Sequence, residues 1–172
     1  RKKKKPIAYI VGKKEFWKNE FLLNNSVLIP RPDSELIVEE TLDNTRSDKI
    51  YNILDIGTGS GCIIISVIKE RNKSYGIGID ISKEAARIAK TNAKIQQLKN
   101  RIKIIHSDID NFFSNKYDLI LSNPPYIKKC ICNSLDEGIR NFEPKLALDG
   151  GLDGYSIIKK VIKKSSKLIK IN

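Results

Sequence analysis

The chain lacks several features that would point to secreted, metal-binding or membrane proteins. Its 172 residues include one histidine, one tryptophan and only three cysteines. The cysteines are odd in number, none forms a C-x-x-C pair, and Cys-Ile-Cys is a poor zinc pair without further ligands, so we predict no metal site and no disulfide framework. No apolar run approaches the roughly 20 residues that cross a bilayer, and no signal peptide is visible. We therefore expect reduced thiols, a cytoplasmic location and no membrane association.

Acidic residues are also scarce relative to basic ones. Asp and Glu number 20 against 32 Lys and Arg, which gives a formal net charge of +12. Such an excess favours nucleic acid or a ribosome-associated partner. A compositional bias toward Lys, Ile and Asn explains it equally well, because Lys is spread along the chain with clusters only at 1–5 and 159–170. Direct nucleic-acid binding is therefore compatible with the sequence but not required by it.

Methionine is absent altogether, including an initiator. The chain opens on Arg-Lys-Lys-Lys-Lys and stops just past a predicted helix, so we expect a fragment of a longer polypeptide. Hydrophobic residues make up 40% and charged residues 30%, which suits one globular domain with a core. We expect three parts: a basic linker remnant at 1–5, a short extended or hairpin region with a lead-in helix at 6–45, and a main domain at 46–172 that is incomplete at its C-terminus.

From residue 51 onward, patterns typical of strands and helices alternate. Strands are predicted at 51–56, 75–80, 102–106 and 117–122, helices at 62–71, 83–97 and 154–169, and a long loop at 127–153. This β-α-β-α-β order predicts an α/β fold with a doubly wound, mainly parallel sheet. Ligands of such sheets bind beyond the carboxyl ends of the strands.

The region before residue 46 is predicted to be less regular. Short extended pieces are expected at 8–11, 15–17 and 20–23, around Gly12. Pro30-Arg31-Pro32 should stop them, and Asp33 or Ser34 can cap a helix that runs to about Asp43.

A glycine-rich turn follows the first strand of the main domain. Asp55-Ile56 leads into Gly57-Thr58-Gly59-Ser60-Gly61, where glycines let the backbone turn sharply and approach a ligand. The spacing is G-x-G-x-G rather than the dinucleotide G-x-G-x-x-G, and no G-K-[ST] is present, which excludes a P-loop. Asp80 ends the second strand, where a carboxylate can accept hydrogen bonds from both ribose hydroxyls. Together these features predict a ribonucleoside cofactor.

The surrounding acids narrow the choice of cofactor. Asp55 sits directly before the glycines, which disfavours a pyrophosphate and suits the cationic amine and sulfonium of S-adenosylmethionine. At the third strand end, Asp108 could accept a hydrogen bond from the adenine amine and Ile109 could pack on its ring. A plain strand-end Asp and a core Ile are competing interpretations of these two residues.

The fourth strand ends in Asn123-Pro124-Pro125-Tyr126. The Asn123 side chain and the Pro124 carbonyl offer two acceptors, Pro125 stiffens the turn, and Tyr126 provides an aromatic face. Two acceptors beside an aromatic ring suit a planar –NH2, as in an amide or an aromatic amine. Amide nitrogens are poor nucleophiles, so holding the nitrogen in place has to supply much of the catalysis. The competing interpretation of this motif is a proline-rich turn after a strand.

With these motifs in order, the chain resembles class I S-adenosylmethionine-dependent methyltransferases. It is most similar to the peptide chain release factor N(5)-glutamine methyltransferases of the HemK/PrmC type. The resemblance covers nearly the whole chain and rests on five blocks: 6–12 with 15–16, 27–35, 55–61, 123–126, and 142–151 with 153–154. The second block corresponds to the family's Pro-Arg-Pro-Glu-Thr-Glu signature, in which this chain has the shorter residues Asp33 and Ser34.

The resemblance implies methyl transfer to the glutamine of the Gly-Gly-Gln loop in a release factor, which would be the protein partner. It assigns 46–172 as the S-adenosylmethionine-binding domain. It also implies a seven-stranded sheet behind a small helical domain, so we expect this chain to end before the fifth strand. Two alternatives stay open: a methyltransferase acting on exocyclic amines of adenine or guanine in nucleic acids, and a catalytically inactive fragment.

The residues matched to these motifs form the candidate site. Asn123, Pro124 and Tyr126 are predicted to be catalytic, and with Pro125 they are predicted to bind substrate. The predicted cofactor-binding residues are Asp55, Gly57, Thr58, Gly59, Ser60, Gly61, Asp80, Asp108, Ile109 and Asn123. We expect no strong general base, and His106 is predicted to be structural or on the surface. Arg31 is expected to brace a loop or bind an acidic partner, and Glu143 to orient the substrate loop or cap a turn.

Overall fold

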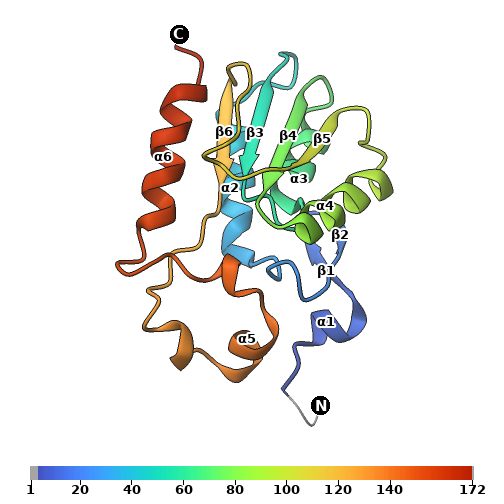
Figure 1. The fold of residues 1–172 in the computed structure, drawn as a ribbon. Helices are drawn as coiled ribbons and strands as arrows, with labels where there is room; N and C mark the ends of the chain where they lie inside the picture. The colour runs from blue at the N-terminus through green and yellow to red at the C-terminus, as the bar shows by residue number, and fades with distance from the viewer. Residues whose placement is uncertain (1–3, 172) are drawn as a thin grey trace.

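The structure, a computed structural model, describes residues 4–171, so most of the predicted basic linker at 1–5 lies outside the described residues (Figure 1). Its main sheet has four parallel strands in the order β5-β4-β3-β6. They are β3 (Asn52–Ile56), β4 (Tyr75–Asp80), β5 (Ile102–His106) and β6 (Leu119–Ser122). Each crossover carries the chain back to the same end of the sheet, so all carboxyl ends meet at one edge. The predicted α/β fold with a doubly wound, mainly parallel sheet is confirmed.

Helices cover both faces of this sheet. The first face carries α2 (Glu35–Asp43), α3 (Cys62–Glu70) and α4 (Lys83–Ile95), and the second carries α6 (Ser156–Leu168), which stands beside β6 (Figure 1). In α3, all residues from Cys62 to Ile68 are buried, because this helix lies between the sheet and the hairpin described below. In α4, one face is built of small residues, Ala85, Ala86, Ala89 and Ala93, which let the helix approach the sheet closely.

The two faces have separate apolar cores. The first joins Ile53 and Leu121 of the sheet to α3 and to Phe16 and Phe21 of the N-terminal region. The second joins Leu54 and Ile79 to Phe112, Tyr117 and Leu168. Alternate residues of β3 therefore enter opposite cores, as the period of two in a strand requires. No helix among residues 4–171 is both long and apolar enough to cross a membrane.

The N-terminal region corrects one prediction. The segment at 8–11 is not extended: α1 spans Ile7–Val11 and ends at Gly12, whose φ of +78° is a left-handed cap. Tyr9 fixes this turn by donating a hydrogen bond from its hydroxyl to Val27 O at 2.6 Å. Five residues are too few to reveal a helix through periodicity, and the tertiary contact decides the conformation. The next two predicted pieces do form strands, β1 (Lys13–Phe16) and β2 (Asn19–Leu22), paired as an antiparallel hairpin.

The predicted loop at 127–153 also contains more structure than expected. It includes α5 (Glu137–Phe142) and two 3₁₀ turns, η2 (Cys132–Ser134) and η3 (Lys145–Ala147). Asp136 starts α5 by accepting a hydrogen bond from Gly138 N at 2.7 Å, a capping signal that the polar composition of the segment concealed. A further 3₁₀ turn, η1 (Pro32–Ser34), precedes α2, and the Ser34 side chain does not cap that helix.

The start of the fourth strand is a smaller difference. The prediction began it at residue 117, whereas β6 begins at Leu119. Tyr117 instead forms an isolated parallel bridge with Ile169, just after α6. Its N–H donates to Leu168 O at 2.8 Å, and its carbonyl accepts from Lys170 N at 2.9 Å. The chain therefore returns alongside β6 in the parallel sense, on the side away from β3.

Candidate functional site

A cavity of about 440 Å³ opens at the carboxyl ends of the parallel strands. Its walls come from the turn after β3, the ends of β4 and β6, the segment 26–34 before α2, and the segment 144–149. Eight of the ten predicted cofactor-binding residues line it: Gly57, Thr58, Gly59, Ser60, Asp80, Asp108, Ile109 and Asn123. Three of the four predicted substrate-binding residues, Asn123, Pro124 and Pro125, line it as well. Pairing of the strands in parallel brings these distant segments together.

The glycine-rich turn leaves room for a ligand. Gly57 has a φ of +73°, and a Cβ built there would meet nothing within 4 Å. The N–H groups of Gly57 and Thr58 both donate to Ile79 O at 2.9 Å, which ties the turn to β4. A backbone that is held firmly but open on its outer side can be approached closely by a bound molecule.

Gly61 does not line the cavity, so its predicted contact with a cofactor stays a prediction. It precedes α3 with a φ of +82°, and a Cβ there would lie 2.9 Å from Ile65 Cδ1 and 3.3 Å from Ala89 Cβ. The missing side chain is what lets α3 and α4 pack together at this end. Gly61 therefore supports the turn through helix packing.

Asp80 presents a carboxylate to the cavity from the end of β4. Its Oδ2 accepts from Gly59 N at 2.9 Å and its Oδ1 accepts from Ser82 N at 2.8 Å. Burial raises the pKa of this carboxyl, while the two backbone N–H groups and His106 oppose that rise. Each oxygen has a further lone pair, so the fixed carboxylate can accept hydrogen bonds from a pair of adjacent hydroxyls.

Asp55 lies beneath the turn rather than on the cavity wall. It is 1% exposed, and its Oδ2 accepts from Thr58 Oγ1 at 2.7 Å. Its Oδ1 is buried without a hydrogen-bond partner among the described residues. Burial raises the pKa of this carboxyl to about 7. An unpartnered buried carboxylate oxygen next to a ligand turn is the kind of group that a cation or a bound water satisfies.

Asn123 is held by Ser34, which the sequence indicated as a candidate helix cap and as part of a family motif, but not as a partner of Asn123. The Asn123 Nδ2 donates to Ser34 Oγ at 2.9 Å, and Ser34 is itself buried. This bond uses the donor half of the amide and leaves Oδ1 as a free acceptor. Ser34 therefore fixes the orientation of Asn123, a role that no local pattern indicated.

Tyr126 stands apart from the other three residues of its motif. Its side chain is 66% exposed and does not line the cavity. The backbone of Tyr126 is packed against Gly150, where a Cβ would come within 2.8 Å of Tyr126 Cα. Its contribution to substrate binding stays a prediction.

An ion pair joins two walls of the cavity. Arg31 donates from Nη2 to Glu143 Oε1 at 2.7 Å, and the Glu143 side chain is 1% exposed. The bond connects the segment before α2 with the segment after α5 across 112 residues of sequence. Of the two roles considered for Arg31, the geometry favours the brace. His106 lies on the surface, where its Nε2 donates to Ile81 O at 3.0 Å.

Asn92 was not singled out from the sequence, although it supports this end of the molecule. It is 1% exposed; its Oδ1 accepts from Leu22 N at 2.9 Å, and its Nδ2 donates to Leu22 O at 3.1 Å and to Ser60 O at 2.8 Å. One amide thus links the β1-β2 hairpin, α4 and the glycine-rich turn. An asparagine on the alanine-lined face of a predicted helix was the available signal.

The fold is that of class I, Rossmann-like methyltransferases. Among solved structures, the hMettl16 catalytic domain in complex with an RNA hairpin superimposes with a TM-score of 0.69 at 18% identity, covering 86% of this chain and 56% of that one. A human methyltransferase 10 domain containing protein gives 0.61 at 21% identity, covering 86% and 64%. A methyltransferase from Geobacter sulfurreducens, solved with S-adenosyl-L-homocysteine, gives 0.53 at 19% identity, covering 87% and 47%. At these identities the likeness concerns the fold.

Sequence comparison gives the family. Residues 32–147 match the methyltransferase small domain family, and the chain belongs to it. The release factor glutamine methyltransferase of Caulobacter vibrioides is 38% identical over 171 residues, which are 99% of this chain and 59% of that protein. The enzyme of the same name from Buchnera aphidicola is 41% identical, covering 95% and 58%, and a bifunctional methyltransferase from Rickettsia typhi is 40% identical, covering 95% and 37%. The chain thus spans less than two thirds of the length of these relatives.

Proposed function

We propose that this protein transfers the methyl group of S-adenosylmethionine to the side-chain amide nitrogen, N(5), of the glutamine in the Gly-Gly-Gln motif of a peptide chain release factor. The observation that carries the proposal is that Asp80 and Asn123, from the ends of two different strands, line one cavity. A nucleoside held at Asp80 and a planar amide held at Asn123 would then meet over the end of β3, the strand between β4 and β6.

The described residues fit the proposed cofactor. The turn at Gly57 is open to close approach, and Asp80 offers a fixed carboxylate for ribose hydroxyls. Asp55, directly beneath the turn, has a buried oxygen without a partner among the described residues, which adds an acidic group near the proposed cofactor. Asp108 and Ile109 line the same cavity, in line with their proposed contacts to adenine. The cofactor supplies an electrophilic methyl group when bound.

The substrate amide would be oriented by acceptors. With its Nδ2 engaged by Ser34, Asn123 can direct Oδ1 at one N–H of the glutamine, and the Pro124 carbonyl can accept the other. Holding both N–H groups fixes the amide nitrogen and directs its lone pair at the methyl group. This orientation matters because an amide nitrogen is a weak nucleophile. The proton leaves to water after transfer. Tyr126, whose side chain is exposed and does not line the cavity, is proposed to pack on the amide plane once the substrate is bound.

The choice of a release factor as partner is supported by the names of the relatives and by the match of blocks such as Phe142-Glu143-Pro144 and Asp149-Gly150-Gly151. The motif Asn-Pro-Pro-Tyr alone suits any planar amine, including the exocyclic amine of a flipped base.

Two alanine variants test the proposal. Asn123→Ala should lower kcat for release factor methylation by about 100-fold or more, because positioning is lost, while it weakens S-adenosylmethionine binding far less than Asp80→Ala does. Asp80→Ala should instead weaken cofactor binding, measured by calorimetry. Asn44→Ala, at an exposed position after α2, is the matched control and should behave as the unmodified protein.

Mass spectrometry of the methylated release factor locates the modified residue. An unchanged rate for Asn123→Ala would contradict the proposal. Faster methylation of DNA or RNA than of the release factor would favour the nucleic-acid alternative. Binding of S-adenosylmethionine without transfer to any of these substrates would favour an inactive fragment.

A further inference from the structure

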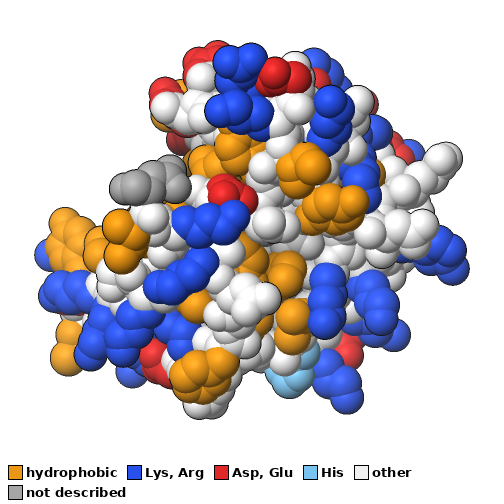
Figure 2. Space-filling model, turned by 90° about the horizontal axis from the view of Figure 1, so that it is seen from above, with side chains coloured by type: hydrophobic (Ala, Val, Ile, Leu, Met, Phe, Trp, Pro, Cys, Tyr) orange, Lys and Arg blue, Asp and Glu red, His pale blue; other side chains and the backbone are white. Residues whose placement is uncertain are grey.

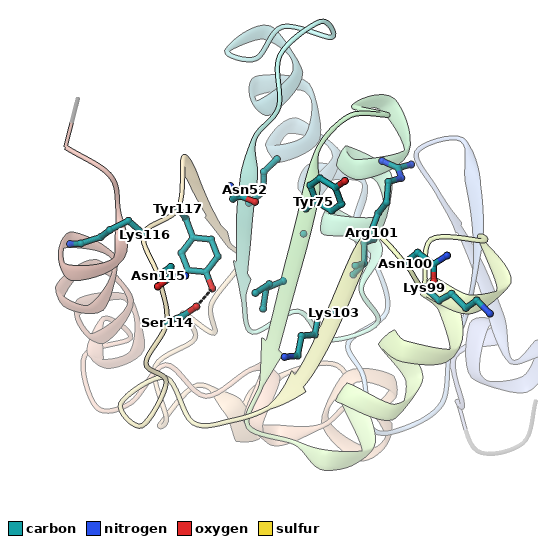
Figure 3. A pocket seen from close by; sticks show the side chains of 14 residues that line it. Asn52, Tyr75, Lys99, Asn100, Arg101, Lys103, Ser114, Asn115, Lys116 and Tyr117 are labelled. Carbon is teal, nitrogen blue, oxygen red and sulfur yellow. Dashed lines mark hydrogen bonds between the residues drawn. The ribbon is translucent and has the colours of Figure 1, made fainter.

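A second cavity, of about 350 Å³, lies at the opposite end of the sheet from the candidate site. It opens on the second face of the sheet near the amino ends of β3, β4 and β5, between the turn at 99–101 and the segment 114–117 (Figure 3). α6 covers this face only on the β6 side, through Val161 and Leu168, and α3 and α4 lie on the other face. Part of the sheet surface is therefore left open here.

The charged side chains that line this cavity are all basic. Lys99, Arg101, Lys103 and Lys116 line it, and no Asp or Glu among residues 4–171 does. Lys99 and Lys103 form no ion pair with any described residue. Asp118, next to the lining segment, is already engaged by Lys170 and by Asn52 N. Seen from this end, the surface shows Lys and Arg far more often than Asp and Glu (Figure 2).

One of these cations is fixed by the protein itself. Arg101 Nη1 donates to Ile68 O at 2.7 Å, to Arg71 O at 3.1 Å and to Ser74 O at 3.3 Å. Three backbone carbonyls hold its guanidinium, but none of them carries a full negative charge. The positive charge is therefore positioned without being neutralised by a carboxylate.

The lining also contains an aromatic ring and three side-chain amides, beside apolar residues such as Ile53 and Ile77. Tyr75 is 50% exposed and lies on the open face of β4, beside Asn52 of β3 in the strand register (Figure 3). The side-chain amides of Asn52, Asn100 and Asn115 are at the edges of the same cavity. None of these four side chains hydrogen bonds to another described residue, so their donors and acceptors are free for a ligand.

We propose that this surface binds a segment of single-stranded RNA, independently of the methyl transfer proposed above. One base stacks on Tyr75, amide groups of Asn52, Asn100 or Asn115 bond to its edge, and the flanking phosphates lie near Lys116 on one side and Lys99, Arg101 and Lys103 on the other (Figure 3). An acidic peptide would match the charge and could hydrogen bond to the amides, but its carboxylate side chains offer no flat base to stack on the exposed ring.

Binding of a fluorescein-labelled single-stranded RNA of ten nucleotides, followed by anisotropy, tests the proposal. Tyr75→Ala should weaken binding by about 5-fold or more, since one stacked base is lost. Lys103→Gln should lower the slope of log K against log salt by about 0.7, the contribution of one phosphate contact on a single strand. Lys90→Gln, on the exposed side of α4, is the control with the same charge change and should leave the slope unaltered.

Affinity for S-adenosylmethionine is measured in parallel and should be the same in all three variants, which also shows that they are folded. Equal losses for Lys103→Gln and Lys90→Gln would overturn the proposal, because binding would then follow total charge alone. Displacement of the RNA by polyglutamate at equal charge concentration would also overturn it, in favour of an acidic protein partner. Loss of RNA binding on saturation with S-adenosylmethionine would place the RNA at the first cavity instead.

Discussion

Asn92 provides the sharpest test of how this fold supports its candidate site. Its amide pairs with both the N–H and the carbonyl of Leu22, as a neighbouring strand would, and its Nδ2 also donates to Ser60 O in the glycine-rich turn. Asn92→Ala would leave three backbone groups without these partners. Only the Ser60 bond is fully buried, while the two at Leu22 are partly open to water, which can replace part of the loss.

The expected loss of stability in Asn92→Ala follows from how deeply each of the three hydrogen bonds is buried. Leaving a buried backbone carbonyl unsatisfied costs about 1–3 kcal/mol, and losing a partly exposed hydrogen bond costs about 0.5–1.5 kcal/mol. One of the first kind and two of the second give a destabilisation of about 4 kcal/mol. For a chain of this length each kcal/mol lowers Tm by about 2–4 °C, so a fall of about 8–16 °C is expected in differential scanning calorimetry.

Two further variants separate hydrogen bonding from packing. Asn92→Asp keeps the volume but removes the NH2 group and turns a carboxylate toward Leu22 O and Ser60 O, so it should destabilise at least as much as Asn92→Ala. Thr91→Ala changes the adjacent, exposed position and should not lower Tm, because alanine is the better helix former. If Asn92→Ala melts no lower than Thr91→Ala, the reasoning is refuted.

The other predictions concern the glycine-rich turn. Gly61→Ala should lower Tm more than Gly57→Ala does, because both positions have positive φ but only at Gly61 would the new Cβ meet Ile65 Cδ1, at 2.9 Å. Gly57→Ala should mainly weaken S-adenosylmethionine binding. Thermal melts measure the first effect and calorimetry the second. Burial raises the pKa of Asp55 to about 7, so the folded state holds a proton that the unfolded state releases above about pH 4. This contribution to the free energy of unfolding is complete below about pH 4 and is lost as the pH rises through 7. The Tm of the parent relative to that of Asp55→Asn should therefore fall between pH 4 and 8. A constant difference in Tm over this range would contradict the prediction.

Much of the fold and of the candidate site can be predicted from local sequence patterns. The order of strands and helices after residue 51 is enough to predict a parallel sheet, since crossovers of one hand place every carboxyl end at the same edge. The glycines after β3, Asp80 after β4 and Asn123 after β6 therefore had to meet, and the structure brings them to one cavity. After residue 51, the predicted ends of strands and helices differ from the observed ends by a few residues at most. The last turn of an element depends on tertiary contacts, which the hydrophobic pattern does not contain.

What local patterns did not reveal depends on pairs that are far apart in the chain. Ser34 meets Asn123 across 89 residues, Arg31 meets Glu143 across 112, and Asn92 meets Leu22 across 70. The short helix α1 likewise owes its conformation to Tyr9 and Val27 rather than to periodicity. The spacing of apolar residues and the residue types in turns specify where the backbone turns and which face of a strand or helix packs on the core. The partner of a single polar side chain is specified only when packing has brought the two segments within hydrogen-bonding distance and removed the water between them.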